Sequence, residues 1–285
     1  DLLGEGGTAR VFRARDRKTG ETVALKVLKP SLAADRDALD AFIQESKLLI
    51  GLECPHIVKG IRVAREGDVF FCAMEWIDGV CLQDEIGEDS LLDETLALMV
   101  VMQIGTALAY LHSQGLVHRD VKPGNIMLGS GDRAVLIDLG FAVSSGRSQQ
   151  EDSDTTAGTV HYISPEQARG QGGLDVRADI YSLGATLYHL VTGSLPFKGE
   201  THEEIMAKQV LESLSGDTIR ALELSPHVHY FIEKMMAKDV DIRFQDPDAL
   251  VTALQRHLES QEREQEAEQE ALKRSKSKRR LRRFM

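Results

Sequence analysis

One stretch decides the fold of this 285-residue chain: VHRDVKPGNIML, residues 117–128. Apolar residues at both ends bracket an unusually dense set of polar ones, which is not the pattern of a chance surface loop. A second apolar run, AVLID at residues 134–138, ends in an acidic residue. Asn125 and Asp138 supply hard oxygen ligands of the kind that Mg²⁺ prefers beside substrate phosphates. Asp120 is then an oriented carboxylate that can accept a hydroxyl proton.

Upstream of this stretch lies a glycine-rich segment, LGEGGTARV at residues 3–11. Glycines let a backbone approach phosphate oxygens closely, and the strand that follows would cover a nucleotide. On its own the segment is equally typical of a plain hairpin, because Ala9 stands where a GxGxxG pattern has its third glycine.

The nucleotide interpretation gains support from VALK at residues 23–26. Lys26 on an apolar strand can reach the phosphates of a nucleotide beneath the glycine-rich loop, and it needs a partner there. Glu45 is the candidate, because helical periodicity places it on the apolar side of the next helix, with Phe42 and Leu49. The alternative for Glu45 is an ordinary solvated helix residue.

Composition fits a soluble globular protein and excludes a generic nucleic-acid binder. Hydrophobic residues make up 42% and charged residues 28% of the chain. The formal net charge is −11, whereas a nucleic-acid-binding domain should be strongly basic. Three scattered cysteines are too few for a disulfide framework, so we expect free thiols in a reducing compartment.

The first third of the chain is predicted to contain mainly strands. Strand-like patterns cover residues 22–28, 57–64 and 69–76, and a helical pattern covers 35–52. Beyond Gly79 the apolar residues recur at helical spacing, over residues 93–112, 178–193, 201–213, 225–237 and 247–258.

We therefore predict an α+β fold with two lobes. A small β-rich N-lobe, residues 1–76, is joined through a hinge at 77–79 to a larger helical C-lobe at 80–258. The longest uncharged run, residues 95–111, falls just short of a membrane span and is interrupted by polar residues, so we expect a buried core helix there.

Motifs of one family stand in order along the chain. After the glycine-rich loop, the VALK lysine, the helix glutamate and HRDVKPGN come DLG at 138–140, GT at 158–159, SPE at 164–166 and DIYSLG at 179–184. With this ordered set the sequence resembles a eukaryotic-type (Hanks-type) serine/threonine protein kinase from Leu2 to about Leu258. The resemblance implies the bilobal protein-kinase fold and phosphoryl transfer from ATP to protein hydroxyls (EC 2.7.11.1 class).

The resemblance also implies a role for each matching residue. Asp120 would be the catalytic base, Lys122 would contact the γ-phosphate, and Lys26, oriented by Glu45, would hold the α- and β-phosphates. The implied metal ligands for Mg²⁺, or Mn²⁺ in its place, are Asn125 and Asp138. The implied ATP-binding residues lie in the glycine-rich loop, the next strand, the hinge region and the C-lobe: Leu3, Gly4, Glu5, Gly6, Gly7, Thr8, Ala9, Arg10, Val11, Ala24, Lys26, Met74, Glu75, Ile77 and Met127.

Other matching residues imply structural and regulatory roles. Glu166 would pair with Arg243 and brace the helical lobe, and Asp179 would hold the catalytic loop through its backbone. Arg119 would meet a phosphorylated activation segment, and we predict autophosphorylation at Thr155 or Thr156. Thr159 would bridge Asp120 and Lys122, which favours Ser/Thr over Tyr as the substrate hydroxyl.

Two other functions are weighed against an active protein kinase. A kinase-fold scaffold that signals by binding would need a lost lysine, base or metal ligand, and none is lost here. A kinase of small molecules usually lacks the GT and SPE elements. Four positions depart from the family pattern without removing such a residue: Ala9, Leu139, Ser164 and Tyr181.

The last segment, residues 259–285, differs in charge from the rest. It carries nine basic and six acidic residues, and eight of the basic ones lie between Lys273 and Arg283. It has too little apolar surface to fold alone. Bacterial relatives often continue from such a basic stretch into a membrane helix, so we expect a cytoplasmic domain with membrane attachment beyond Met285. The resemblance also leaves room for a kinase dimer that phosphorylates itself in trans; nucleic acid is not an expected partner.

Overall fold

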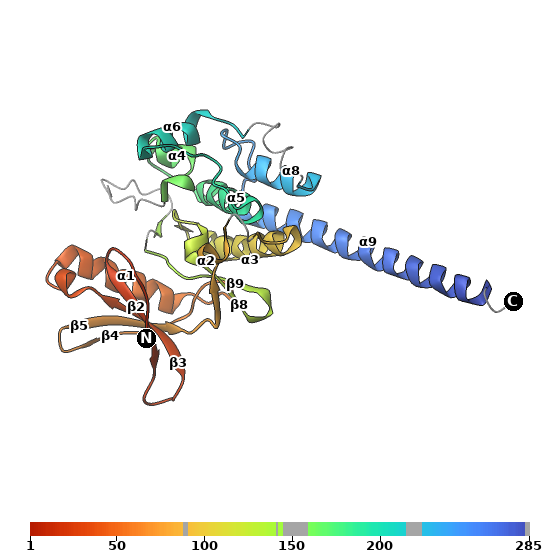
Figure 1. Cartoon of the computed structure of the whole chain (residues 1–285). Coiled ribbons are helices and arrows are strands. Elements are labelled where there is room, and N and C mark those ends of the chain that lie inside the picture. The colour runs from red at the N-terminus through yellow and green to blue at the C-terminus, as the bar shows by residue number, and fades with distance from the viewer. Residues whose placement is uncertain (88–90, 141, 145–158, 215–223, 283–285) are drawn as a thin grey trace.

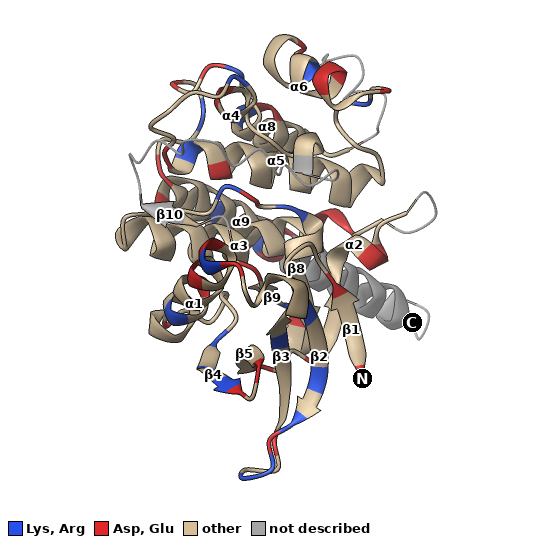
Figure 2. Ribbon diagram, turned by 90° about the vertical axis from the view of Figure 1, so that its left-hand side faces the viewer, with Lys and Arg blue, Asp and Glu red and all other residues tan. Residues whose placement is uncertain are grey.

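The computed structural model describes residues 1–87, 91–140, 142–144, 159–214 and 224–282 (Figure 1). A smaller lobe contains a five-stranded antiparallel sheet and one long helix, and the larger lobe is mostly helical. Figure 2 shows the same division from the side, with the sheet and α1 in one part and the C-lobe helices in the other. The predicted α+β, bilobal fold is confirmed.

The N-lobe sheet has the strand order β1-β2-β3-β5-β4. Its strands in chain order are β1 (Leu2–Glu5), β2 (Ala9–Arg15), β3 (Thr22–Leu28), β4 (Gly60–Glu66) and β5 (Val69–Glu75). The bounds predicted for β3 are confirmed, because its alternating, β-branched sequence fits a half-buried strand.

The prediction for β4 was wrong at its start, because that strand begins at Gly60 rather than at residue 57. Ile57 and Val58 pair instead with the C-lobe. Ile57 forms a parallel bridge with Leu136, and the N–H of Val58 donates to the carbonyl of Leu136 at 2.9 Å. These two apolar residues therefore join the lobes instead of extending the sheet.

Helix α1 (Arg36–Gly51) begins after Asp35, whose side chain accepts hydrogen bonds from the N–H groups of Asp37 and Ala38. Phe42 and Leu49 are buried beneath the helix. Glu45 therefore emerges on the inward side of α1, as the apolar periodicity predicted.

The C-lobe is built around two central helices, α3 (Glu94–Ser113) and α5 (Val176–Thr192). Among the described residues, α3 is the one helix long and apolar enough to cross a membrane, but nine of its residues are buried within the protein. The prediction of a core helix is confirmed. The other α-helices in the described part of the C-lobe, apart from the last, are α2 (Leu82–Glu85), α4 (Pro165–Ala168), α6 (His202–Leu211) and α8 (Pro226–Met235).

Short strands line the C-lobe where it faces the N-lobe. A three-stranded sheet contains β6 (Gly79–Cys81), β8 (Ile126–Gly129) and β9 (Arg133–Leu136), and β7 (Leu116–Val117) pairs with β10 (Val143–Ser144). The hairpin of β8 and β9 has the two predicted metal-binding residues at its open end. The N–H of Ile137 donates to the carbonyl of Asn125 at 2.9 Å, which places Asp138 beside Asn125.

The last helix, α9 (Pro247–Arg282), is much longer than the predicted 247–258. Its first part is anchored in the C-lobe by Leu250, Leu254 and Leu258, and the rest projects from the body (Figure 1). Apolar periodicity did not predict this extension, because residues 259–282 contain few apolar residues. Their Glu, Gln, Ala, Lys and Arg side chains favour helix, and an anchored helix can propagate without a new nucleus.

Candidate active site

Three charged side chains from three elements meet between the lobes. The Nζ atom of Lys26, on β3, lies 2.5 Å from Oε1 of Glu45 on α1 and 3.2 Å from Oδ1 of Asp138 after β9. The Lys26–Glu45 contact implied by the family resemblance is therefore present. The participation of Asp138 in the same cluster was not predicted. Together the three side chains carry two carboxylates and one ammonium group.

Gly140 lets the two carboxylates share this space. A Cβ atom at residue 140 would lie 3.3 Å from Oδ1 of Asp138 and 3.7 Å from Oε2 of Glu45. The N–H of Gly140 also donates to Oδ1 of Asp138 at 3.1 Å. The glycine of the DLG segment thus leaves room for the cluster and adds a hydrogen-bond donor to it.

The pKa values of the cluster reflect its charge imbalance. Burial alone lowers the pKa of Lys26, but Asp138 and Glu45 outweigh burial and raise that pKa above its usual value. Burial also opposes ionisation of Asp138, yet the Lys26 ammonium holds the pKa of this carboxyl at about 2. Burial raises the pKa of Glu45 to about 7, against the attraction of Lys26 and with the repulsion of Asp138. Asp138 is therefore the carboxylate that keeps its negative charge.

The catalytic-loop candidate Asp120 is buried and held by two donors. Nδ2 of Asn125 donates to both the carbonyl and Oδ2 of Asp120, each at 2.8 Å. Nζ of Lys122 lies 2.8 Å from the same Oδ2. The structure therefore brings together Asp120, Lys122 and Asn125, as the HRDVKPGN segment suggested.

Two buried side chains fix the backbone of this loop. Asp179, on α5, accepts hydrogen bonds from the N–H of His118 at 2.8 Å and of Arg119 at 2.7 Å, which confirms its predicted structural role. The Asp120 N–H lies 3.2 Å from Nδ1 of His118, and the Asp138 carbonyl lies 2.7 Å from Nε2. Because an N–H only donates and a carbonyl only accepts, the His118 ring is neutral and carries its proton on Nε2. His118 thereby links the catalytic loop to Asp138.

Asn125 and Asp138 fit a divalent metal ion. The amide nitrogen of Asn125 is engaged by Asp120, which leaves its oxygen as the atom of that amide that can bind a cation. The cluster of Lys26, Glu45 and Asp138 has one carboxylate more than it has ammonium groups, and Mg²⁺ prefers oxygen ligands of this kind.

A family model for the protein kinase domain matches residues 1–257. The chain belongs to the protein kinase family. It is 34% identical over 251 residues to the serine/threonine-protein kinase PknB of Mycolicibacterium smegmatis, covering 86% of this chain and 40% of that protein. It is 33% identical over 237 residues to the serine/threonine-protein kinase PrkC of Bacillus subtilis, covering 83% of this chain and 36% of that protein. The chain thus spans about two fifths of the length of these relatives.

In this kinase domain the predicted ATP-binding residues lie on β1, β2, β3, β5 and β8, in the loop between β1 and β2, and, for Ile77, just after β5. The register pairs Ala24 with Met74 across β3 and β5. The N–H of Glu75 donates to the carbonyl of Lys59 at 2.9 Å, so an adenine ring can use the carbonyl of Glu75 but not its amide. The sequence could not distinguish these two backbone groups.

The glycine-rich loop of the kinase connects β1 to β2. The side chains of Glu5 and Arg10 lie 3.0 Å apart across this hairpin, and Lys29 approaches Glu5 at 3.1 Å. These side chains are engaged with one another, so Glu5 and Arg10 would contribute to nucleotide binding through their backbone. A Cβ at Gly4 or Gly7 would meet nothing within 4 Å, so sterics of the protein itself do not require glycine there.

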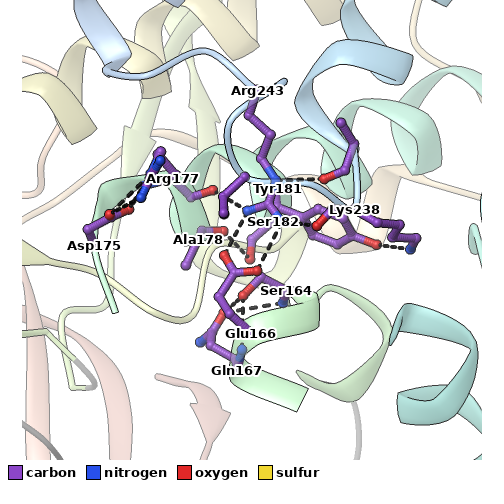
Figure 3. A network of polar contacts seen from close by, with 12 residues as sticks. Ser164, Glu166, Gln167, Asp175, Arg177, Ala178, Tyr181, Ser182, Lys238 and Arg243 are labelled. Atoms are coloured by element: carbon purple, nitrogen blue, oxygen red, sulfur yellow. Dashed lines mark hydrogen bonds and ion pairs between the residues drawn. The ribbon is translucent and has the colours of Figure 1, made fainter. Parts of the chain in front are cut away.

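A separate polar network braces the C-lobe (Figure 3). Arg243 forms two hydrogen bonds with Glu166, at 2.7 and 2.9 Å, which confirms the predicted pair. Its guanidinium also donates to the carbonyls of Ala237 and Arg177 and lies over the ring of Tyr181. Sequence reasoning missed Lys238, which donates to the Tyr181 hydroxyl at 2.7 Å in the same network.

Gln167 is another residue that sequence reasoning missed. It forms a capping box with Ser164 at the start of α4, and its Nε2 donates to the carbonyl of Arg119 at 3.0 Å. The spacing of Ser164 and Gln167 is a visible capping-box signal, but its link to the catalytic loop is not.

The predicted regulatory residues are only partly described. Arg119 is buried beside Asp120 and has a positive φ of 70°. Thr155 and Thr156 lie outside the described residues. Thr159 begins the short helix η4 (Thr159–His161), and its side chain lies outside the described part, so its predicted bridge to Asp120 and Lys122 stays a prediction.

Proposed function

We propose that this kinase domain transfers the γ-phosphoryl group of ATP to Ser or Thr hydroxyls of proteins. The observation that carries the proposal is the buried Asp120 carboxylate, held by Asn125 and Lys122 next to the Lys26–Glu45–Asp138 cluster. Such an arrangement supplies an oriented base beside a site for phosphates and a metal ion. The naming of PknB and PrkC as serine/threonine kinases supports the choice of hydroxyl.

In the proposed reaction the hydroxyl oxygen of the substrate attacks the γ-phosphorus. The new O–P bond forms as the bond to the β-phosphate oxygen breaks, ADP leaves, and the hydroxyl proton passes to Asp120. Lys26 would hold the α- and β-phosphates and Lys122 the transferred group. A bound Mg²⁺ or Mn²⁺ would neutralise phosphate charge, with Asn125 and Asp138 as its protein ligands.

The same proposal extends to the regulation of the kinase domain and to its location in the cell. Autophosphorylation at Thr155 or Thr156 would add negative charge near Arg119, and a second copy of the domain would be the partner for transfer in trans. The basic residues at the end of α9 suit the cytoplasmic flank of a membrane anchor.

Asp120→Asn tests the chemical step. The variant keeps the shape and the hydrogen bonds of the side chain but lacks a base, so turnover should fall by about 100- to 10,000-fold. The measurement is transfer of labelled phosphate from ATP to a Ser/Thr protein substrate, with phosphoamino-acid analysis of the product.

Asp68→Asn is the matched control, because Asp68 is exposed in the turn between β4 and β5. It should transfer phosphate like the unaltered protein. Unchanged turnover in Asp120→Asn, or phosphate found on Tyr alone, would refute the proposed function. A protein that binds ATP but transfers nothing would favour the scaffold interpretation.

A further inference from the structure

A pocket in the helical lobe is lined by none of the residues assigned to catalysis, ATP binding or metal binding. It has a volume of about 420 Å³. Its walls come from three parts of the chain: Gln83 on α2, His161 and Tyr162 at the end of η4, and the segment from His189 on α5 to Lys198. A hollow of this size is near the lower end of the range for small-ligand pockets and can admit one side chain.

The charges in this pocket differ from those of the chain as a whole. The chain carries 45 acidic and 34 basic residues. None of the described residues that line the pocket has a carboxylate, whereas His161, His189 and Lys198 contribute three nitrogen bases. The described lining therefore offers a ligand one lysine and two imidazole side chains and no carboxylate.

His189 is the buried base of this pocket, and its surroundings change its pKa. Its Nδ1 lies 2.7 Å from the hydroxyl of Tyr162, and both side chains are buried. Burial, followed by the nearby charges of His161 and Lys198, lowers the pKa of His189. A negatively charged group in the pocket could pair with Lys198 and would weaken the part of this shift that comes from nearby positive charge.

Two parts of the pocket lining connect to the catalytic loop. On one side, the Cβ of Gln83 lies 3.9 Å from where a Cβ on Gly124 would be, between Lys122 and Asn125. On the other, the chain runs from His161 to Gln167, whose side chain donates to the carbonyl of Arg119. A peptide whose hydroxyl reaches Asp120 would therefore pass beside the pocket.

We propose that this pocket binds a negatively charged side chain of the protein substrate, a carboxylate or a phosphoryl group, close in sequence to the phosphorylated hydroxyl. The inference rests on the proposed function and adds a substrate preference to it. Lys198, which is exposed, provides the positive charge, and the partly buried His161 provides a second nitrogen group. His189 and Tyr162 provide buried hydrogen-bonding groups at the base.

Peptides that differ at one position near the acceptor Ser test the preference. The variable residue is Glu, phosphoserine, Gln or Lys, scanned through the positions on both sides of the acceptor, and kcat/KM is measured for each. At one position, Glu or phosphoserine should exceed Gln by about tenfold, the worth of one charge-assisted hydrogen bond. Phosphoserine well above Glu identifies a phosphoryl group as the ligand, whereas equal values identify any anion.

Lys198→Glu should reverse the order, so that Lys exceeds Glu at that position. Lys198 is exposed, so its replacement does not disturb the core. Lys18→Glu makes the same charge change on an exposed turn of the N-lobe and should keep the preference for anions. An equal rate for all four residues at every position, or the same preference in Lys198→Glu as in Lys18→Glu, would overturn the inference while leaving the proposed function intact.

A binding measurement separates failure of the pocket from failure of the catalytic function. A fluorescent peptide with Ala at the acceptor and Glu at the scanned position is titrated with the protein, and anisotropy is followed. Tighter binding of the Glu peptide than of the Gln peptide, lost in Lys198→Glu, supports the pocket even if no phosphate is transferred. Equal binding of the two peptides by a protein that also transfers no phosphate would refute both proposals.

Discussion

Two buried ionic clusters in this protein differ in their charge balance. In the C-lobe, Glu166 and Arg243 neutralise each other, and the guanidinium has further bonds to backbone carbonyls. Between the lobes, Lys26 faces the two carboxylates of Glu45 and Asp138. The Arg243 side chain has no exposed surface, whereas 37% of the Asp138 side chain is exposed.

The difference distinguishes a brace from a binding site. An ion pair whose guanidinium is fully buried and bonded to both a carboxylate and backbone carbonyls has no free donor for a ligand, and breaking it leaves an uncompensated charge. A partly exposed cluster with an excess carboxylate has a charge that a metal ion can neutralise. The balance of charge, rather than burial alone, therefore separates the structural cluster from the functional one.

Replacing a glutamate by glutamine in each cluster should give the largest difference in the free energy of unfolding. Glu166→Gln leaves the Arg243 guanidinium buried without its counter-charge and should cost about 3–5 kcal/mol of unfolding free energy. Glu45→Gln should change the unfolding free energy by less than about 1 kcal/mol, because the Asp138 carboxylate still balances the charge of Lys26. Urea unfolding followed by circular dichroism measures both. Equal losses in the two variants would contradict the comparison.

Replacing lysine by arginine in one cluster and arginine by lysine in the other should affect catalysis in the first case and stability in the second. Lys26→Arg keeps the charge but replaces a compact ammonium by a larger planar group, so kcat/KM should fall on the order of 100-fold with little change in melting temperature. Arg243→Lys should do the reverse, losing about 1–3 kcal/mol of stability through lost hydrogen bonds. Initial rates and thermal melts of both variants measure this. A fully active Lys26→Arg variant would show that the cluster does not position phosphates.

The smallest expected effect, a change in stability with pH, concerns His189, a buried base for which the described residues supply no carboxylate partner. Because the pKa of His189 is lowered in the folded state, the unfolded chain binds more protons than the folded protein as pH falls below about 6.5. Stability should therefore decrease from pH 7 toward pH 5. Burial is the main cause of this lowered pKa, followed by the charges of His161 and Lys198, and the Tyr162 hydroxyl lies 2.7 Å from Nδ1 of His189.

His189→Gln should remove part of that acid sensitivity, because Gln can still bond to Tyr162 but does not take up a proton. Thermal melts at several pH values measure it. The exposed His112 provides a matched control, and His112→Gln should melt like the unaltered protein at every pH. An acid-induced loss that is the same in all three proteins would assign the effect to other groups.

Local sequence patterns correctly predicted those elements whose buried face can be recognised from the spacing of apolar residues within the element itself. The strand at 22–28 was predicted with its true bounds, and Glu45 was selected correctly from its place on the apolar side of a helix. The start of β4 was wrong because Ile57 and Val58 pair with Leu136, far away in sequence. Sequence periodicity reports burial, but it does not report against which element a residue is buried.

The sequence alone determined which chemical groups this kinase domain possesses and in what order they occur, because each motif is local and its residue types follow from its chemistry. Only the tertiary structure decided how their charges combine. Lys26, Glu45 and Asp138 come from three separate elements, and so do Gln83, His161 and His189. The excess of carboxyl groups over ammonium groups at the first site and the gathering of nitrogen bases at the second arise from long-range packing, which no local pattern encodes.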